Sequence, residues 1–337
     1  MWFMETYLST FDSDIDVLTR VDHDKIPEGT IYKFWLHLVT DGIGQPILIP
    51  IMIAKGNSPG KTLGLTAAVH GNEINGIPII QSLFQHIDVT QLCGMLIGIP
   101  VVNVPSLLRK KRRFPDGSDL NHIMPGKPYG NVGQVYAYRF FNQIVKHFDY
   151  LVDLHTASFG RVNSYYIRAD MDDPGTAKMA LLQNAQIIVH NPPSDGTLRG
   201  AAESIGIPSI TLEVGDPNKF QKGMVRSSLT GIHNLLIHMG MLKGTIEPPD
   251  NLPVICRHSF WMYTDAGGIL TIEPKLTDWV KKGDRVAMLR NIFGDRIKEY
   301  FAPDDGIIVG KGVNPIVQTG GRILHLGLTT TSSNERK

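Results

Sequence analysis

Short apolar segments alternate with longer, amphipathic ones along residues 30–250. The short segments are rich in β-branched residues and are bounded by Gly, Pro or polar residues, which predicts strands. They cover residues 32–39, 46–56, 62–69, 94–102, 150–154 and 209–214. The first two are separated by the turn-forming stretch 42–45 and are expected to pair antiparallel at a sheet edge. This alternation predicts an α/β fold in which helices flank a sheet.

Two of the longer segments carry apolar residues at steps of three and four, the spacing of one helix face. These segments are residues 133–148 and 227–242, and in the first the face is expected to consist of Val135, Tyr138, Phe141, Val145 and Phe148. Residues 109–131 differ, because they are polar, basic and rich in Gly and Pro. We expect a long loop there, and loops of that length in compact domains are usually functional.

The pattern changes at residues 243–253, where paired prolines and polar residues predict a linker. Beyond it the chain has short β-like runs separated by Gly-containing turns, which is typical of a small all-β domain. The length of 337 residues also exceeds the usual size of a single core. We therefore predict an α/β domain over residues 1–248 and a β domain over residues 249–337.

Composition narrows the classes of partner. The charge is almost balanced, with 33 Lys and Arg against 32 Asp and Glu, so neither nucleic acid nor a membrane is expected to bind. Cys93 and Cys256 are far apart, which argues against a disulfide framework or a thiolate metal site and favours the cytoplasm. Residues 1–18 lack the pattern of a signal peptide, and no apolar run is long enough to span a bilayer. A small-molecule partner is expected, and a homo-oligomer is left open.

Candidate metal ligands follow two of the predicted strands. His70 and Glu73 come directly after residues 62–69, and His155 comes directly after residues 150–154. In open α/β sheets the ligand crevice lies outside the carboxyl ends of the strands. Two imidazoles and one carboxylate, with a fourth position left to water, suit a catalytic zinc ion, and we expect one per chain. The alternatives are a surface helix pair for His70 and Glu73 and a core histidine for His155.

Two further acids are placed near the same edge. Asp153 lies on the same strand face as His155 and is expected to orient that imidazole. Glu213 lies near the end of the apolar segment 209–214, where a carboxylate is costly unless it is paired or used. Beside a metal-activated water it would serve as general base and then return the proton to the leaving nitrogen. The alternative is a salt bridge from Glu213 to an arginine of the loop 109–131.

The basic loop supplies cations that would bind an anionic substrate or polarise a carbonyl group. They are Arg109, Lys110, Lys111, Arg112 and Arg113. Most residues of such a run are usually solvated, so we expect only some of them to take part. Asn121 is expected to hold a carboxylate beside them.

Five motifs occur in one order: HGNE at 70–73, VNVP at 102–105, RRFPDGSDLNHIMPG at 112–126, VDLHT at 152–156 and LEVG at 212–215. In this order and spacing they resemble the succinylglutamate desuccinylase/aspartoacylase family of zinc amidohydrolases, relatives of the zinc carboxypeptidases. The resemblance covers roughly residues 45–240 and implies a zinc-carboxypeptidase-like mixed sheet. It implies zinc ligands at His70, Glu73 and His155, a general base at Glu213 and a carbonyl-polarising arginine at Arg113.

The resemblance also implies where this chain departs from the family. The family motif Asp-Leu-Asn-Arg, whose last two residues grip a substrate carboxylate, ends here in Asn121 and His122. Since histidine binds a carboxylate more weakly than arginine does, Arg109, Arg112 or Arg161 is expected to substitute, with Arg161 favoured. The β domain resembles a biotinyl/lipoyl hybrid sandwich but has neither Met-Lys-Met nor Asp-Lys-Ala in its turns, so no carried cofactor is expected.

These patterns favour one function over two others. The favoured function is a zinc-dependent hydrolase that cleaves the amide bond of a small N-acylated amino acid or amine. One alternative is a metallocarboxypeptidase that acts on peptides. The other is a non-catalytic binding protein on the same fold, against which the intact set of His70, Glu73, His155 and Glu213 argues. A β domain covering the crevice would exclude peptides and admit only small substrates.

Overall fold

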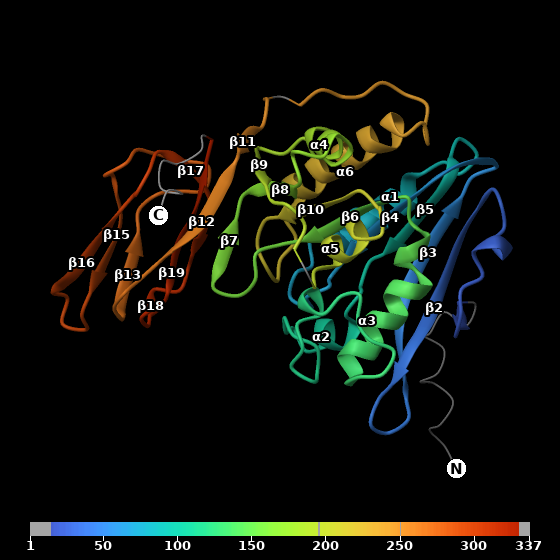
Figure 1. The fold of residues 1–337 in the computed structure, drawn as a ribbon, viewed down its shortest axis with the longest axis horizontal. Coiled ribbons are helices and arrows are strands. Elements are labelled where there is room, and N and C mark those ends of the chain that lie inside the picture. Colours follow the sequence, from blue (N-terminus) through green and yellow to red (C-terminus); the bar gives the residue numbers. More distant parts are fainter. Residues whose placement is uncertain (1–14, 195, 250, 330–337) are drawn as a thin grey trace, which may run out of the picture.

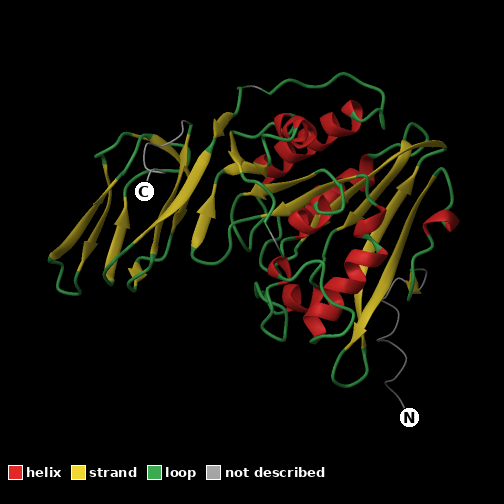
Figure 2. Ribbon diagram, viewed as in Figure 1, coloured by secondary structure: helices red, strands yellow, loops and turns green. Residues whose placement is uncertain are grey.

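A large mixed sheet with helices on both faces lies beside a smaller all-β part in the computed structural model (Figures 1 and 2). The structure describes residues 15–194, 196–249 and 251–329. Residues 1–14, part of the stretch assessed for a signal peptide, lie outside that range. Among the described residues, no helix has the length and apolar character needed to cross a membrane.

The large sheet contains ten strands within the described residues, in the order β1-β2-β3-β5-β4-β6-β10-β8-β9-β11. Their bounds are β1 Asp16–Leu18, β2 Thr30–Thr40, β3 Pro46–Lys55, β4 Ser58–Ala67, β5 Cys93–Ile99, β6 Tyr150–His155, β8 Tyr165–Ala169, β9 Ile187–His190, β10 Ser209–Val214 and β11 Val254–Cys256. The three central strands β4, β6 and β10 are parallel neighbours. The strands predicted from the sequence are confirmed, including the antiparallel pair β2 and β3.

Helices cover both faces of this sheet, which buries its apolar strands on two sides. The α-helices are α1 Gly76–His86, α2 Val104–Leu108, α3 Val132–Gln143, α4 Pro174–Leu181, α5 Leu198–Glu203 and α6 Lys222–His238. Short 3₁₀ turns occur at His23–Lys25, Leu120–His122 and Val145–His147. Helices α3 and α5 share one core cluster with β2 and β3, whereas α1, α4 and α6 share the other.

The predicted apolar face of α3 is wrong in part. The helix buries Gly133, Tyr136, Ala137, Phe140 and Phe141, whereas Val135 and Tyr138 are only half-buried. The helix also ends at Gln143, and the 3₁₀ turn that follows changes the angular position of the later residues. The buried hydroxyl of Tyr136 donates a hydrogen bond to the Val102 carbonyl oxygen, which explains how a polar ring can occupy the core face.

The smaller part consists of two antiparallel sheets that share an apolar core. One contains β12 His258–Tyr263, β14 Trp279–Val280, β17 Gly306–Gly312 and β19 Arg322–Leu328. The other contains β13 Gly268–Ile272, β15 Arg285–Arg290, β16 Arg296–Phe301 and β18 Ile316–Val317.

Two strand pairings join segments on opposite sides of the predicted domain boundary between residues 248 and 249. Strand β11 follows the linker yet pairs with β9 in the large sheet. Strand β7, Arg161–Asn163, precedes the linker yet pairs with β17 of the smaller part. A further apolar cluster contains residues from both sides of that boundary, namely Tyr166, Ile187, Val189, Cys256, Ile307 and Val309.

Candidate active site

The carboxyl ends of the three central parallel strands meet at one edge of the sheet. His70 lies just beyond β4, and His155 is the last residue of β6. Glu213 on β10 lies directly opposite His155 in the strand register. The topology therefore brings together side chains that are far apart in sequence.

The turn that carries His70 and Glu73 is fixed by close packing and buried amides. The Glu73 N–H donates to the His70 carbonyl oxygen at 3.0 Å. A Cβ at Gly71 would lie 2.0 Å from the Ser106 carbonyl carbon, so only glycine lets the turn approach α2 so closely. The buried Asn75 amide donates to the Val214 carbonyl oxygen at 2.7 Å, which ties the turn to the end of β10.

We call His70, Glu73 and His155 the histidine wall, because a ring nitrogen of each histidine faces the Glu73 carboxylate. The Nδ1 atoms of His70 and His155 lie 3.0 and 2.9 Å from the two carboxylate oxygens of Glu73. Each Nε2 atom is bound from outside, in His70 by Asp119 at 2.9 Å and in His155 by Asp153 at 2.7 Å. Asp153 also accepts a hydrogen bond from Thr66 at 2.7 Å. These outer carboxylates fix both rings, as expected for Asp153 from the sequence.

The histidine wall fits a divalent cation. One ligand atom from each residue lies within 4.8 Å of the others. His70 Nδ1 is buried and lies 3.0 Å from Glu73, but among the described residues it makes no hydrogen bond of good geometry. Burial opposes charge on the His155 ring, yet Asp153 and Glu73 outweigh it and raise its pKa well above the ordinary value. Burial likewise opposes ionisation of Glu73, yet His70 and His155 hold its pKa well below the ordinary value. The site therefore offers nitrogen and oxygen donors in a buried position, the ligand set that zinc prefers.

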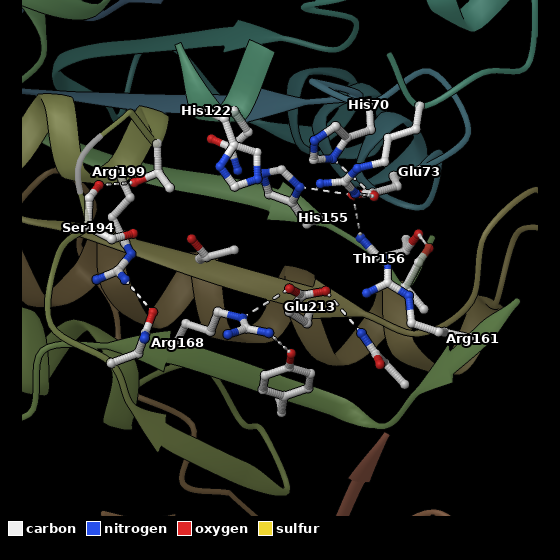
Figure 3. Close-up of a pocket in the computed structure, with 18 of the residues that line it drawn as sticks. His70, Glu73, His122, His155, Thr156, Arg161, Arg168, Ser194, Arg199 and Glu213 are labelled. Atoms are coloured by element: carbon white, nitrogen blue, oxygen red, sulfur yellow. Dashed lines mark hydrogen bonds and ion pairs between the residues drawn. The ribbon is translucent and has the colours of Figure 1, made fainter. Parts of the chain in front are cut away.

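Both oxygens of the Glu213 carboxylate are held by side-chain donors from neighbouring segments. Arg168 on β8 donates from Nε to Oε1 at 3.1 Å, and Asn163 on β7 donates from Nδ2 to Oε2 at 3.1 Å. Figure 3 shows Glu213 between Arg168 and Arg161, facing the His155 side of the pocket. The alternative prediction for Glu213 was a salt bridge to an arginine of the loop 109–131. Glu213 does form an ion pair, but its partner is Arg168 on β8.

These groups line one pocket with a volume of about 300 Å³. Four arginines reach it, which we call the arginine wall: Arg112, Arg161, Arg168 and Arg199. Arg199 is only 4 % exposed, and its NH1 atom has no hydrogen-bond partner among the residues that the structure describes. Its NH2 atom donates to Asn191 at 2.7 Å, and Glu203 lies 3.6 Å from NH1. A buried cation with a free donor is costly, so this wall favours an anionic ligand.

The basic loop sends Arg112, and not Arg113, into the pocket. Arg112 donates to Glu73 from NH1 and to Asp119 from Nε, each at 2.9 Å. Arg113 is exposed, and its guanidinium donates to the Gly117 carbonyl oxygen of its own loop at 3.0 Å. The resemblance assigned the carbonyl-polarising role to Arg113, but this geometry favours its neighbour.

The remaining predicted residues lie at the pocket with unequal burial. Asn121 accepts a hydrogen bond from the Leu198 N–H at 2.8 Å, which joins the loop to α5. The His122 ring is 66 % exposed and lies 4.0 Å from Asp119, at the rim. Arg161 is half-buried, and its Nε atom has no hydrogen-bond partner. Its guanidinium lies 6.0 Å from the Trp261 ring centre, so the smaller part of the molecule contributes an aromatic side chain to the pocket.

A comparison with protein families identifies the group to which this site belongs. The model of the succinylglutamate desuccinylase/aspartoacylase catalytic domain matches residues 59–239, which contain the histidine wall, the arginine wall and Glu213. The chain belongs to this family.

Individual relatives of this family member are distant but span most of its length. The N-alpha-acetyl-L-2,4-diaminobutyric acid deacetylase of Halomonas elongata is 24% identical over 290 residues, covering 82% of this chain and 84% of the relative. The product-bound structure of the ectoine utilization protein EutE (DoeB) from Ruegeria pomeroyi has a TM-score of 0.82, at 24% identity over 90% of this chain and 98% of that one. A succinylglutamate desuccinylase/aspartoacylase from Rhodobacter sphaeroides also reaches 0.82, at 24% identity over 91% of this chain and 98% of its own. These structures confirm the predicted mixed α/β fold.

Sequence reasoning missed pocket residues of this family member, among them Arg168, Arg199, Trp261 and Asn163. Arg168 had a usable signal, because it is a charged residue inside the short apolar strand YYIRA. Arg199 had none, since it is the second residue of a short helix in a polar segment. Trp261 lies in the smaller part, beyond the family match, where sequence reasoning assigned no pocket residue.

Proposed function

We propose that this chain is a zinc-dependent deacylase that cleaves the amide bond of a small N-acylated amino acid or related amine. The observation that carries the proposal is the geometry of one pocket. It combines a ligand set for one zinc ion, a carboxylate on the adjacent strand and two arginines that each have a nitrogen without a hydrogen-bond partner among the described residues. Membership of a deacylase family supports the reaction class.

His70, Glu73 and His155 would hold the metal. A zinc ion held there would polarise the amide carbonyl and lower the pKa of a water molecule. Glu213 would accept a proton from that water and deliver it to the leaving nitrogen, which a carboxylate fixed in one orientation does efficiently. Arg112 would stabilise negative charge that develops on the carbonyl oxygen, in the role first assigned to Arg113.

Arg199 is our candidate for binding the substrate carboxylate. It is buried, it lines the pocket, and its NH1 atom has no hydrogen-bond partner among the described residues, although Glu203 lies 3.6 Å away. A guanidinium binds a carboxylate through two parallel hydrogen bonds, a role for which His122 at the exposed rim is poorly suited. The relative from Halomonas elongata is named for an N-acetylated amino acid, which bears such a carboxylate.

Pocket size favours the deacylase over a peptide-cleaving carboxypeptidase. The volume of about 300 Å³ is at the small end for ligand sites. Trp261 lines the pocket and stacks on His325 at 5.3 Å, so the smaller part forms a packed wall of it. A small N-acyl amino acid fits these limits better than a peptide does.

Replacement of Glu213 by glutamine tests the proposal against a non-catalytic binding protein. The amide keeps the shape of the side chain but cannot accept the proton, so turnover should fall by about 10² or more while zinc content stays unchanged. Released amine would be measured with a panel of N-acyl amino acids and N-acyl diamines, including N-alpha-acetyl-L-2,4-diaminobutyrate. Near-wild-type turnover in Glu213→Gln would remove this residue from the mechanism. No hydrolysis of any panel member by zinc-loaded wild type would favour the binding protein.

A further inference from the structure

The junction between the two parts of the molecule lies next to the candidate base. Strand β7 pairs antiparallel with β17, with Asn163 opposite Gly310 and Arg161 opposite Gly312. Figure 1 shows β7 extending from the large sheet toward the smaller part. The two outer residues of this three-residue strand line the active pocket. The position of these pocket residues is therefore set by a strand from beyond the linker.

Hydrogen bonds outside the strand pair reinforce this junction. The register of β17 against β19 shifts between Ile308 and Gly310. The carbonyl oxygen of Val309, within that irregular step, accepts hydrogen bonds from the Ser164 N–H at 3.0 Å and from the Ser164 hydroxyl at 2.9 Å. The residue that follows Asn163 is thus fixed to β17 as well.

One glycine of β17 touches the side chain that holds the candidate base. A Cβ at Gly310 would lie 2.5 Å from Oδ1 of Asn163, and this is the nearest heavy atom. The other end of the same amide donates from Nδ2 to Glu213 Oε2 at 3.1 Å. This amide orientation follows from the chemistry, because an ionised carboxylate accepts hydrogen bonds and the amide oxygen cannot donate one. Asn163 is only 5 % exposed, so its amide has little room to move elsewhere.

We propose that Asn163 is a positioning residue for Glu213, and that Gly310, beyond the linker, keeps the Asn163 amide in contact with that carboxylate. Within the described part of the chain, the other side-chain hydrogen bond to Glu213 comes from Arg168, to Oε1. Without the hydrogen bond from Asn163, the Glu213 carboxylate could rotate away from the substrate while it keeps its hydrogen bond from Arg168. The inference rests on the proposed function, in which Glu213 is the base.

A double-mutant cycle on the full-length, zinc-loaded protein tests this chain of contacts. Gly310→Ala, Asn163→Ala and the double variant would be assayed with the panel member that wild type hydrolyses best. Each single change should lower kcat about tenfold, the usual value of one hydrogen bond to a charged group, with KM changed less than about twofold. The double variant should fall by about the same tenfold, because Gly310 acts through the Asn163 side chain.

Two results would overturn the inference. Additive effects, giving about a hundredfold loss in the double variant, would show that Gly310 acts independently of Asn163. An unchanged kcat with a raised KM in Asn163→Ala would make this residue a substrate contact instead. If Glu213→Gln retains turnover, Glu213 is not the base and the premise of this inference fails, whereas the proposed function fails only if zinc-loaded wild type hydrolyses no panel member. Additivity together with an inactive Glu213→Gln overturns the present inference alone.

Gly306→Ala is the matched control. Gly306 also lies on β17, and a Cβ there would meet the Gly327 carbonyl oxygen at 2.6 Å, but it does not contact Asn163. This variant should lose thermal stability and keep its kcat per zinc-loaded molecule. A crystal structure of Gly310→Ala should show the Asn163 amide beyond hydrogen-bond distance of Glu213, and an intact contact would contradict the mechanism.

A milder variant keeps the test available if Gly310→Ala does not fold. Ser164→Ala removes the hydroxyl bond to Val309 without adding volume. It should lower kcat about threefold when Asn163 is present and have no further effect in the Asn163→Ala background. Equal effects in both backgrounds would overturn the proposal.

Discussion

The histidine wall and the arginine wall face the same pocket but are built in opposite ways. The histidine wall comes from two adjacent parallel strands, and each of its rings is bound from behind by a carboxylate. The arginine wall comes from the basic loop and from β7, β8 and α5, and two of its members, Arg161 and Arg199, each have a nitrogen without a hydrogen-bond partner among the described residues. A fully supported wall suits a permanent ligand such as a metal, whereas donors left free suit a ligand that arrives and leaves.

The largest effect is expected when one residue of the histidine wall is removed. His70→Ala removes one of the three proposed ligands, so zinc content should fall from about one per chain to background, and turnover should be lost with it. Elemental analysis of the purified protein measures this directly. His122→Ala is the control, since that exposed histidine also lines the pocket and should leave the zinc content unchanged. Full zinc occupancy in His70→Ala would mean that the metal lies elsewhere.

The next largest effect should distinguish the role of Arg112 from that of its neighbour Arg113. Arg112→Met should lower kcat by about 10², because it removes a cation that lies at the metal ligands. Arg113→Met should stay within about twofold of wild type, because its guanidinium is exposed and bonds only its own loop in the contacts described. Steady-state kinetics at equal zinc content make the comparison. The opposite ranking would restore the assignment that the family resemblance implies.

A smaller effect should show whether the arginine wall binds the substrate carboxylate. Arg199→Met should raise KM for an N-acyl amino acid about 10- to 100-fold and change kcat little, as one charge-assisted contact is lost. Burial raises the pKa of Glu203 to about 7, so this carboxyl can take up a proton when its partner is removed. An N-acyl amine without a carboxylate should show no such penalty. An equal penalty for both substrates would show that Arg199 supports the fold rather than the substrate.

The smallest effect concerns the position where this chain departs from its family. His122→Arg restores the family residue, but the side chain lies at the exposed rim, where solvent screens the added charge. We therefore expect at most about a fivefold gain in kcat/KM for N-acetyl-aspartate relative to neutral N-acyl amines. The ratio should be measured at pH 8, where a histidine with an ordinary pKa is neutral. A gain of a hundredfold would place position 122 against the substrate during turnover.

The two walls also differ in how far the sequence predicted them. Apolar strands have a recognisable pattern, and the carboxyl ends of parallel strands meet at one edge, so His70, His155 and Glu213 could be inferred together. Arg199 and Trp261 reach the pocket through a loop and through a strand beyond the linker, and local periodicity carries no information on such long-range contacts. The choice between Arg112 and Arg113 depends on one loop conformation. Resemblance can suggest that choice, whereas the folded loop shows which of the two side chains reaches the pocket.

The apolar cluster that spans the linker has a consequence for how the chain unfolds. Cys256, Ile307 and Val309 from beyond the linker pack with Tyr166, Ile187 and Val189 from before it, and burial raises the pKa of the Cys256 thiol to about 12. Separation of the two parts would expose this shared apolar surface to water, so the chain should melt in one cooperative transition. A protease cut within residues 243–253 should leave two fragments that still migrate as one particle. The Cys256 thiol should react with alkylating reagents only as fast as the whole molecule opens, which makes it a built-in reporter of global unfolding.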